Sequence, residues 1–367
     1  MAAEVLGQRA LNRTLLERQM LRRRCEVPAA EAIARLVGMQ AQVPSNPYVG
    51  LWARLAGFRH EDLAGLIAGR RAVRMPLLRV TLHLVTADDC LALWPVMRGV
   101  LEASLWRSPF GKNLAGVDLE ALVAAGRALM EERPRTNAEL SKRLQALWPD
   151  REAASLAYAT HYLMPVVQVP PRGIWGATGQ PIWTTAAGWL GRPLAAEPSV
   201  DEMVMRYLAA FGPATAMDVR AWSGLTGMRE VIARLRPRLR PFRDEQGREL
   251  FDVPEGLLPD PEEPVPPRFL PDYDNVLLGH ADRTRIVSDE FRQRVGIGKA
   301  AVLVDGFARG AWAIERQGGA VTLVIDEFGA LTARERQEVG EEGQRLLAFV
   351  SGDATSRNVR FGSNAGS

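Results

Sequence analysis

The fold of this chain is decided by residues 199–253, which read SVDEMVMRYLAAFGPATAMDVRAWSGLTGMREVIARLRPRLRPFRDEQGRELFDV. The pattern predicts three helices followed by a β-hairpin: helices over residues 199–211, from Thr215 to Trp222 and over 226–236, and a hairpin over 239–253 that turns at Asp244-Glu245-Gln246-Gly247. Helices followed by such a hairpin are the order of a winged helix, which is a common DNA-docking module.

The same order of elements occurs twice earlier in the chain. The first copy combines predicted helices with an alternating, β-hairpin-like segment: helices over 8–24, 28–38, 48–57 and 60–69, and the hairpin over 73–85. The second copy has predicted helices over 118–132, 136–148 and 151–163 and a two-stranded wing over 166–184. Its middle helix begins with a capping box, because Glu139 follows Thr136 at the required spacing. Three tandem copies predict an α+β fold built from three winged helices.

A proline-rich linker over residues 259–267 separates these copies from the rest of the chain. Beyond it, residues 300–327 contain two β-like runs around Asp305-Gly306, and residues 331–350 predict a helix. The polar, small residues from about 352 predict a tail without regular structure. We therefore expect four regions: 1–86, 87–195, 196–258 and 259–367, of which the first three are winged helices and the last is β-rich with a C-terminal helix.

Composition limits the class of protein and its compartment. The chain has 367 residues, of which 47% are hydrophobic and 24% charged, as in ordinary globular proteins. It lacks an apolar run long enough to span a membrane and a secretory leader. Its two cysteines, Cys25 and Cys90, lie far apart, which argues against a disulfide framework and a cysteine-based zinc site. A soluble, reduced, cytoplasmic protein is expected.

The positive charge is concentrated in the first part of the chain. The net charge is +3 overall, but it is +6 over residues 1–110 and −4 over residues 256–367. Only three of the 46 basic residues are lysines. Arginine binds phosphate in a bidentate manner, although a GC-rich genome produces the same bias. The N-terminal half is therefore the expected face for a polyanion.

Several familiar catalytic and metal-binding patterns are missing. The sequence has no Walker loop, HExxH or GxSxG motif and no set of histidines at metal spacing. His83 is interpreted as a core or hairpin residue. Three carboxylates, Asp272, Asp274 and Asp282, could bind a cation, but turn capping and pairing with Arg283 or Arg285 is the simpler interpretation. We expect no metal and no cofactor.

Two glutamines, Gln40 and Gln42, lie in a segment that we expect to be a loop because of its flanking prolines, Pro44 and Pro47. In an extended backbone the side chains at i and i+2 point to the same side, so both amides could converge on one point. A glutamine cannot titrate, but it accepts hydrogen bonds through its carbonyl and donates two through its NH2 group. Such a pair suits a reaction with an activated leaving group. The alternative is that the side chains staple the loop to the backbone.

The strings Gly38–Pro44 (GMQAQVP) and Pro47–Leu55 (PYVGLWARL) resemble the winged-helix DNA-binding family that includes the AlkZ-type alkylpurine DNA glycosylases. Further matching strings occur in the same order along residues 8–350: RVTLHLV over 79–85, PPRGIWG over 170–176, LPDYDNVLLGHADR over 270–283, and VDG over 304–306. The family motif of two glutamines around one apolar residue matches Gln40, Ala41 and Gln42. A sister branch has glutamine and aspartate instead.

The resemblance implies three winged helices in a C-shaped arrangement around a channel for double-stranded DNA. It implies that Gln40 and Gln42 are catalytic and that the second wing contacts DNA, through Pro171, Arg172 and Trp175. Trp175, like Trp183, could instead anchor the wing to its own domain. The implied activity is a monofunctional glycosylase, acting as a monomer on N7-alkylated purines, with crosslink unhooking and self-resistance as further roles. The alternatives are a non-catalytic transcriptional regulator and a protein–protein scaffold.

Overall fold

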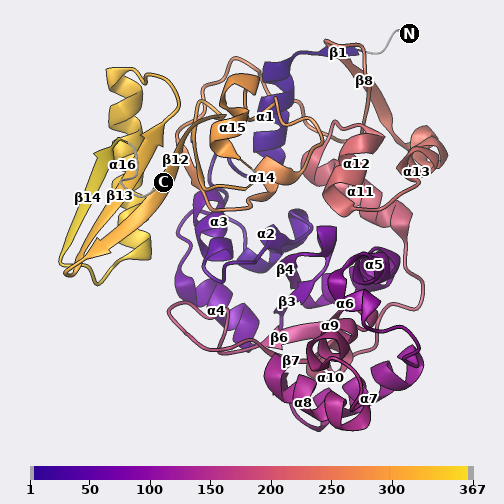
Figure 1. The fold of residues 1–367 in the computed structure, drawn as a ribbon. Helices are drawn as coiled ribbons and strands as arrows, with labels where there is room; N and C mark the ends of the chain where they lie inside the picture. Colours follow the sequence, from indigo (N-terminus) through magenta and orange to yellow (C-terminus); the bar gives the residue numbers. More distant parts are fainter. Residues whose placement is uncertain (1–3, 297, 363–367) are drawn as a thin grey trace.

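The computed structural model describes residues 4–296 and 298–362, and within them the chain is a mixed α+β protein with three separate sheets (Figure 1). A six-stranded sheet has the order β2-β4-β3-β6-β7-β5, a three-stranded sheet the order β1-β8-β9, and a five-stranded sheet the order β10-β11-β12-β13-β14. No helix among the described residues combines the length and the apolar character needed to cross a bilayer.

The N-terminal part has helices and a hairpin where the sequence predicts them. Its elements are α1 Gln8–Arg18, α2 Ala29–Arg35, β2 Met39–Gln40, α3 Asn46–Arg54, α4 His60–Ala68, β3 Ala72–Pro76, the short 3-10 helix η1 Leu78–Val80, and β4 Leu82–Thr86. The expectation of a loop over residues 40–47 was wrong at both ends. Gln40 ends a strand, and Asn46-Pro47 begins α3, because the first turn of a helix does not need the N–H that proline lacks.

The middle part begins with a long helix, α5, that the sequence analysis did not identify. Its elements are α5 Ala87–Arg107, α6 Pro109–Lys112, α7 Leu119–Glu132, β5 Arg135–Thr136, α8 Asn137–Leu147, α9 Ala153–Leu163, β6 Val166–Val169, β7 Ile182–Thr185 and α10 Ala186–Leu190. The capping box of Thr136 and Glu139 is confirmed at the start of α8. The two strands of the wing are shorter than expected, and residues 170–181 form the tip between them.

The third part matches the prediction element by element. It consists of α11 Val200–Phe211, α12 Ala216–Ser223, α13 Met228–Leu235, η2 Arg236–Arg238, β8 Arg240–Asp244 and β9 Glu249–Asp252. The helix predicted to start at Thr215 is α12, and Thr215 is its N-cap, since its side chain accepts from the backbone N–H of Asp218. One strand was not expected: β1 Glu4–Leu6 pairs in parallel with β8. The two chain segments that meet there are far apart in the sequence, so no local pattern indicates the pairing.

The C-terminal part is β-rich, and it corrects two expectations. Its elements are β10 Arg268–Leu270, α14 Asn275–Leu278, η3 Asp289–Phe291, α15 Arg292–Val295, β11 Ala301–Val304, β12 Phe307–Gln317, β13 Ala320–Glu327, α16 Ala333–Val350 and β14 Ser356–Phe361. Residues 300–327 hold three strands rather than two. The segment after 352, expected to lack regular structure, contains β14, which pairs in parallel with β13 and satisfies its open edge.

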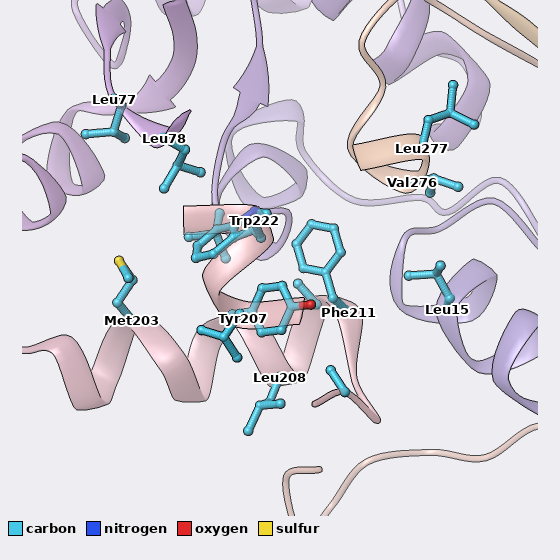
Figure 2. Packing of buried hydrophobic residues seen from close by; sticks show 14 of the residues in the cluster. Leu15, Leu77, Leu78, Met203, Tyr207, Leu208, Phe211, Trp222, Val276 and Leu277 are labelled. Carbon is cyan, nitrogen blue, oxygen red and sulfur yellow. The ribbon is translucent and has the colours of Figure 1, made fainter. Parts of the chain in front are cut away.

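The parts share sheets and cores rather than being separate. The pair Arg74–Gln168 joins β3 to β6 and so links the first hairpin to the second wing. A core formed around Tyr207 and Phe211 of α11 and Trp222 of α12 also contains Leu78, from the tip of the first hairpin (Figure 2). The ring centroids of Tyr207 and Trp222 lie 4.9 Å apart. The tip of the first hairpin is therefore packed directly against the third part.

Candidate active site

Strand β2 carries the first glutamine of the motif against β4. Gln40 pairs with His83, and Met39 pairs with Leu84. The preceding residue, Gly38, has φ +88°, and a Cβ there would lie 2.7 Å from a methyl carbon of Val85. Only glycine fits this close approach without a shift of its neighbour, and the approach brings the motif onto the hairpin.

Both glutamine side chains turn toward the same short segment of that hairpin, residues 79–82. The Gln40 carbonyl oxygen, Oε1, accepts a hydrogen bond from Nη2 of Arg79 at 2.9 Å, and that of Gln42 accepts one from the backbone N–H of Leu82 at 3.2 Å. A guanidinium and an amide N–H only donate, so each amide must present its oxygen there. Gln40 is 8% exposed, whereas Gln42 is exposed. Each oxygen keeps a second lone pair, and the Gln42 bond is the backbone staple that the sequence left open as the alternative.

Arg79 reaches the motif from a strained hairpin tip. Its φ is +51° and that of Val80 is +61°, a region that β-branched residues rarely adopt. Besides its bond to Gln40, the guanidinium donates through Nη1 to the carbonyl oxygen of Trp222, at 2.8 Å. Burial lowers the pKa of Arg79 to about 10, so the group remains charged at neutral pH.

A second arginine, Arg74, holds the backbone of the motif. Its Nη2 donates to the carbonyl oxygen of Ala41 at 2.7 Å, and its Nη1 donates to Oε1 of Gln168 at 2.7 Å. Burial, and then the charge of Arg172, lowers the pKa of Arg74 to about 10. Within the described residues neither Arg74 nor Arg79 has a carboxylate partner. Two arginine cations therefore contact the glutamine motif, one at a side-chain oxygen and one at a backbone oxygen.

His83 confirms the expectation of a core histidine. It is fully buried, and its Nδ1 lies 2.9 Å from the carbonyl oxygen of Thr81. Since a carbonyl only accepts, Nδ1 carries the proton. Burial, with the charge of Arg79 adding to it, lowers the pKa of His83 to about 3. The imidazole therefore stays neutral at physiological pH and does not act as a base there.

The tip of the second wing lies against the N-terminal part. The hydroxyl of Tyr48 donates to the carbonyl oxygen of Gly173 at 2.9 Å and accepts from the backbone N–H of Trp175 at 3.1 Å. The Trp175 ring stacks on His60, with centroids 4.1 Å apart and planes at 14°. Phe349 of α16 lies 4.2 Å from the same imidazole. Trp175 thus anchors the wing tip to the N-terminal part and to α16, and not to its own domain as the alternative role had it.

The other two residues expected on the second wing remain accessible. Pro171 is exposed, and Arg172 is half-buried with its Nη1 donating to the carbonyl oxygen of Gly179 at 2.9 Å. Trp183, by contrast, is 7% exposed and lies against His161. Arg74 lies between the wing tip and the glutamine motif. It bonds to the carbonyl oxygen of Ala41, and a Cβ on Gly173 would lie 2.9 Å from Cδ of Arg74.

Two open clefts are lined by residues adjacent to the motif or bonded to it. A cleft of about 690 Å³ begins at Val43, directly after Gln42, and is walled by Trp175 and Trp312. A second cleft, of about 610 Å³, is lined by Arg79, by α5 and by the turn before α13. The neighbour of Gln42 therefore lines one cleft, and the hydrogen-bond partner of Gln40 lines the other.

The three candidate carboxylates are occupied by protein groups. Asp274 forms a buried bidentate pair with Arg54, Asp282 pairs with Arg248, and Asp272 accepts from the backbone N–H of Ala300. The expected turn capping is confirmed, because Asp274 accepts from the backbone N–H of Val276 and Asp282 from that of Thr284. The expected pairing with Arg283 or Arg285 was wrong, since the partners are Arg54 and Arg248. The described residues contain no group of three or more side chains able to hold a metal ion.

The sequence analysis missed Arg74 and Arg79. Their signal in the sequence was a pair of arginines within the otherwise apolar, alternating segment over residues 73–85. A buried arginine needs buried acceptors, and here the acceptors are the motif, Gln168 and the carbonyl oxygen of Trp222.

Known proteins are similar to this chain over most of its length. The chain is 25% identical, over 354 residues, to the interstrand DNA cross-link repair glycosylase of Streptomyces sahachiroi, covering 85% of this chain and 88% of that protein. The solved structure of the Streptomyces sahachiroi DNA glycosylase AlkZ superposes with a TM-score of 0.77 at 21% identity, covering 98% of this chain and all of the other, and shows that the fold is shared. The family model described as DNA glycosylase AlkZ-like matches residues 33–349, which include both glutamines. The resemblance expected from the sequence is confirmed: the chain belongs to the AlkZ-like DNA glycosylase family.

Proposed function

We propose that this protein hydrolyses the N-glycosidic bond of N7-alkylated purines in double-stranded DNA, with Gln40 and Gln42 as its catalytic residues. The observation that carries the proposal is that both amide oxygens of the family motif are held by donors from one hairpin, residues 79–82. Their remaining lone pairs can meet a water molecule or a sugar.

The chemistry of the lesion explains why two uncharged amides suffice. Alkylation at N7 makes the purine cationic, which weakens the bond between N9 and the sugar C1′. That bond breaks through an oxocarbenium-like state, and the purine leaves with the electron pair. A water oxygen then adds to C1′ and releases a proton. Preorganised carbonyl oxygens position this water and stabilise the positive sugar.

The two amides have different parts in this scheme. Gln42 is exposed next to the cleft at Val43, so it is the amide that can reach the water. Gln40 is nearly buried and its amide oxygen is held by Arg79, so it provides a carbonyl oxygen in a fixed orientation. Glutamine does not titrate, and burial lowers the pKa of His83 to about 3. The rate of excision should therefore be flat between pH 6 and pH 8.

The proposed DNA-binding architecture is three winged helices, over residues 1–86, 87–195 and 196–258, arranged in a C shape around a channel, with residues 259–367 packed beside them. It is supported by the recurrence of helices followed by an antiparallel strand pair in each segment. Pro171 and Arg172 are proposed to meet the DNA backbone. Trp175 is proposed to contact DNA with the part of its ring that His60 leaves open.

The substrate range is proposed from the relative's name. Since a similar protein is named as an interstrand DNA cross-link repair glycosylase, we propose that this chain also unhooks crosslinks formed through purine N7, in self-resistance or repair. It would act as a monomer in the cytoplasm. Release of one linked purine needs no strand cleavage, so a monofunctional enzyme is enough.

The test is excision from a duplex that carries one 7-methylguanine. The native protein should produce an abasic site, revealed as a strand break only after alkali treatment, and Gln42→Ala should lower the rate by roughly 100-fold. Gln337→Ala, an exposed glutamine on α16, is the matched control and should leave the rate unchanged. An inactive native protein, or equal rates for Gln42→Ala and Gln337→Ala, would refute the proposal. Strand breaks without alkali would contradict the monofunctional assignment.

A further inference from the structure

We infer that Arg79 is a positioning residue that fixes the amide of Gln40 and ties it to the third part of the fold. This inference rests on the proposed function, because it concerns the geometry of the proposed reaction. It assigns a role to a residue at the tip of the first hairpin that is not part of the glutamine motif but contacts it.

The hydrogen bonds of Arg79 connect two distant places. One nitrogen, Nη2, donates to Oε1 of Gln40 at 2.9 Å, and the other, Nη1, donates to the carbonyl oxygen of Trp222 at the end of α12, at 2.8 Å. Trp222 is 1% exposed and belongs to the core shown in Figure 2. The guanidinium therefore links the Gln40 amide to a buried core, and the position of this core fixes the position of the amide.

The chemistry of the guanidinium suits this role better than that of any other side chain. Its nitrogens sit in a planar fork and cannot accept, so the Gln40 amide cannot rotate its NH2 group toward Arg79. A lysine would place a single point charge there and could not span both acceptors in the same geometry. The Gln40 oxygen is thereby held in one orientation before DNA binds.

The backbone at the hairpin tip is held in a conformation that its residues disfavour. Arg79 and Val80 both have positive φ, at +51° and +61°. A positive φ is strained for residues other than glycine and persists only where the surroundings over-determine it. The adjacent Leu78 is buried in the same core as Trp222, which is what holds the tip in place.

Arg74 provides a contrast. It bonds to the backbone oxygen of Ala41 and to Gln168, so it holds the course of the loop rather than an amide. Loss of Arg74 would displace both glutamines together. Loss of Arg79 would remove the bond to the Gln40 amide, and a double-mutant cycle of Arg79 with Gln40 tests whether Arg79 acts through that amide.

The experiment measures single-turnover excision of 7-methylguanine and, separately, the Kd for the duplex. Arg79→Met removes all donors while keeping an extended side chain. It should lower the single-turnover rate by roughly 10- to 100-fold, with the Kd changed less than about threefold, and Arg79→Lys should recover part of the loss. Arg334→Met, at an exposed position of α16, is the matched control and should behave as the native protein.

The cycle with Gln40→Ala decides the mechanism. If Arg79 acts through Gln40, Arg79→Met should add less than about twofold to the loss caused by Gln40→Ala. Additive losses, or a Kd that weakens in proportion to the rate, would overturn the inference in favour of a DNA contact or a folding defect. So would an active native protein whose rate does not depend on Gln40.

A measurement without DNA separates this inference from the proposed function. In the 1H–15N NMR correlation spectrum of the free protein, Arg79→Met should shift the side-chain NH2 signals of Gln40, and Arg334→Met should leave them unchanged. An unchanged Gln40 signal would refute the positioning role, whatever the enzyme assay shows. An inactive native protein with a shifted signal would refute the proposed function alone.

Discussion

Replacement of Asp274 by asparagine should destabilise the fold strongly, because it leaves a buried charge without its counter-ion. Asp274 and Arg54 have side chains that are 2% and 1% exposed. They form two parallel hydrogen bonds, Nη1 to Oδ2 at 2.8 Å and Nη2 to Oδ1 at 2.7 Å, and so attach α3 to the segment before α14. Asparagine keeps the size of the side chain but replaces one acceptor oxygen with an NH2 group, so its effect reports the lost charge together with one lost hydrogen bond.

The expected magnitude follows from the burial of both partners. Removing one member of a buried ion pair costs about 3–5 kcal/mol, since the remaining charge stays desolvated. That is a large share of the roughly 5–15 kcal/mol by which native proteins are stable. The Arg54 guanidinium keeps only one neutral acceptor from its own helix, the carbonyl oxygen of Gly50 at 2.9 Å.

The assay is guanidinium-induced unfolding, followed by tryptophan fluorescence. Asp289→Asn is the matched control, because Asp289 pairs with Arg292 at the surface, where the side chains are 76% and 50% exposed. The control should change the free energy of unfolding by less than about 1 kcal/mol. Equal, small effects of Asp274→Asn and Asp289→Asn would refute the argument.

Two further predictions concern the wing tip and acid stability. Gly173→Ala should destabilise the fold by about 1–3 kcal/mol, because its φ is +99° and the new Cβ would meet the Arg74 side chain at 2.9 Å. The control in thermal unfolding is Gly176→Ala, which also has positive φ but has nothing within 4 Å of the new Cβ. An equal loss of stability in both variants would contradict the clash. Burial lowers the pKa of His161 to about 4, so its stabilising contribution is present above pH 6.5 and is lost as the pH falls toward 4. Between pH 7.5 and pH 5 the native protein should lose about 2 kcal/mol more than His161→Gln in urea unfolding, and parallel losses would argue against the shift.

Local signals in the sequence predicted most individual elements correctly. The capping box at Thr136, the helix start at Thr215 and the turn after Asp244 depend on interactions within a few residues, so their patterns carry their own evidence. The family motif at Gln40 and Gln42 was recognised for the same reason, as a short string. Where two strands far apart in the chain pair, as β1 does with β8, the sequence contained no comparable signal.

By itself, then, the sequence determined the α+β character, the order of helices and hairpins, and the glutamine motif with its family. Only the tertiary structure decided what surrounds that motif: Arg79 and Arg74 behind it, Trp175 stacked on His60, and Asp274 paired with Arg54. The physical reason is that helix caps and tight turns are formed by neighbours along the chain. The orientation of a buried amide instead depends on donors brought from other parts of the fold, and packing chooses those donors.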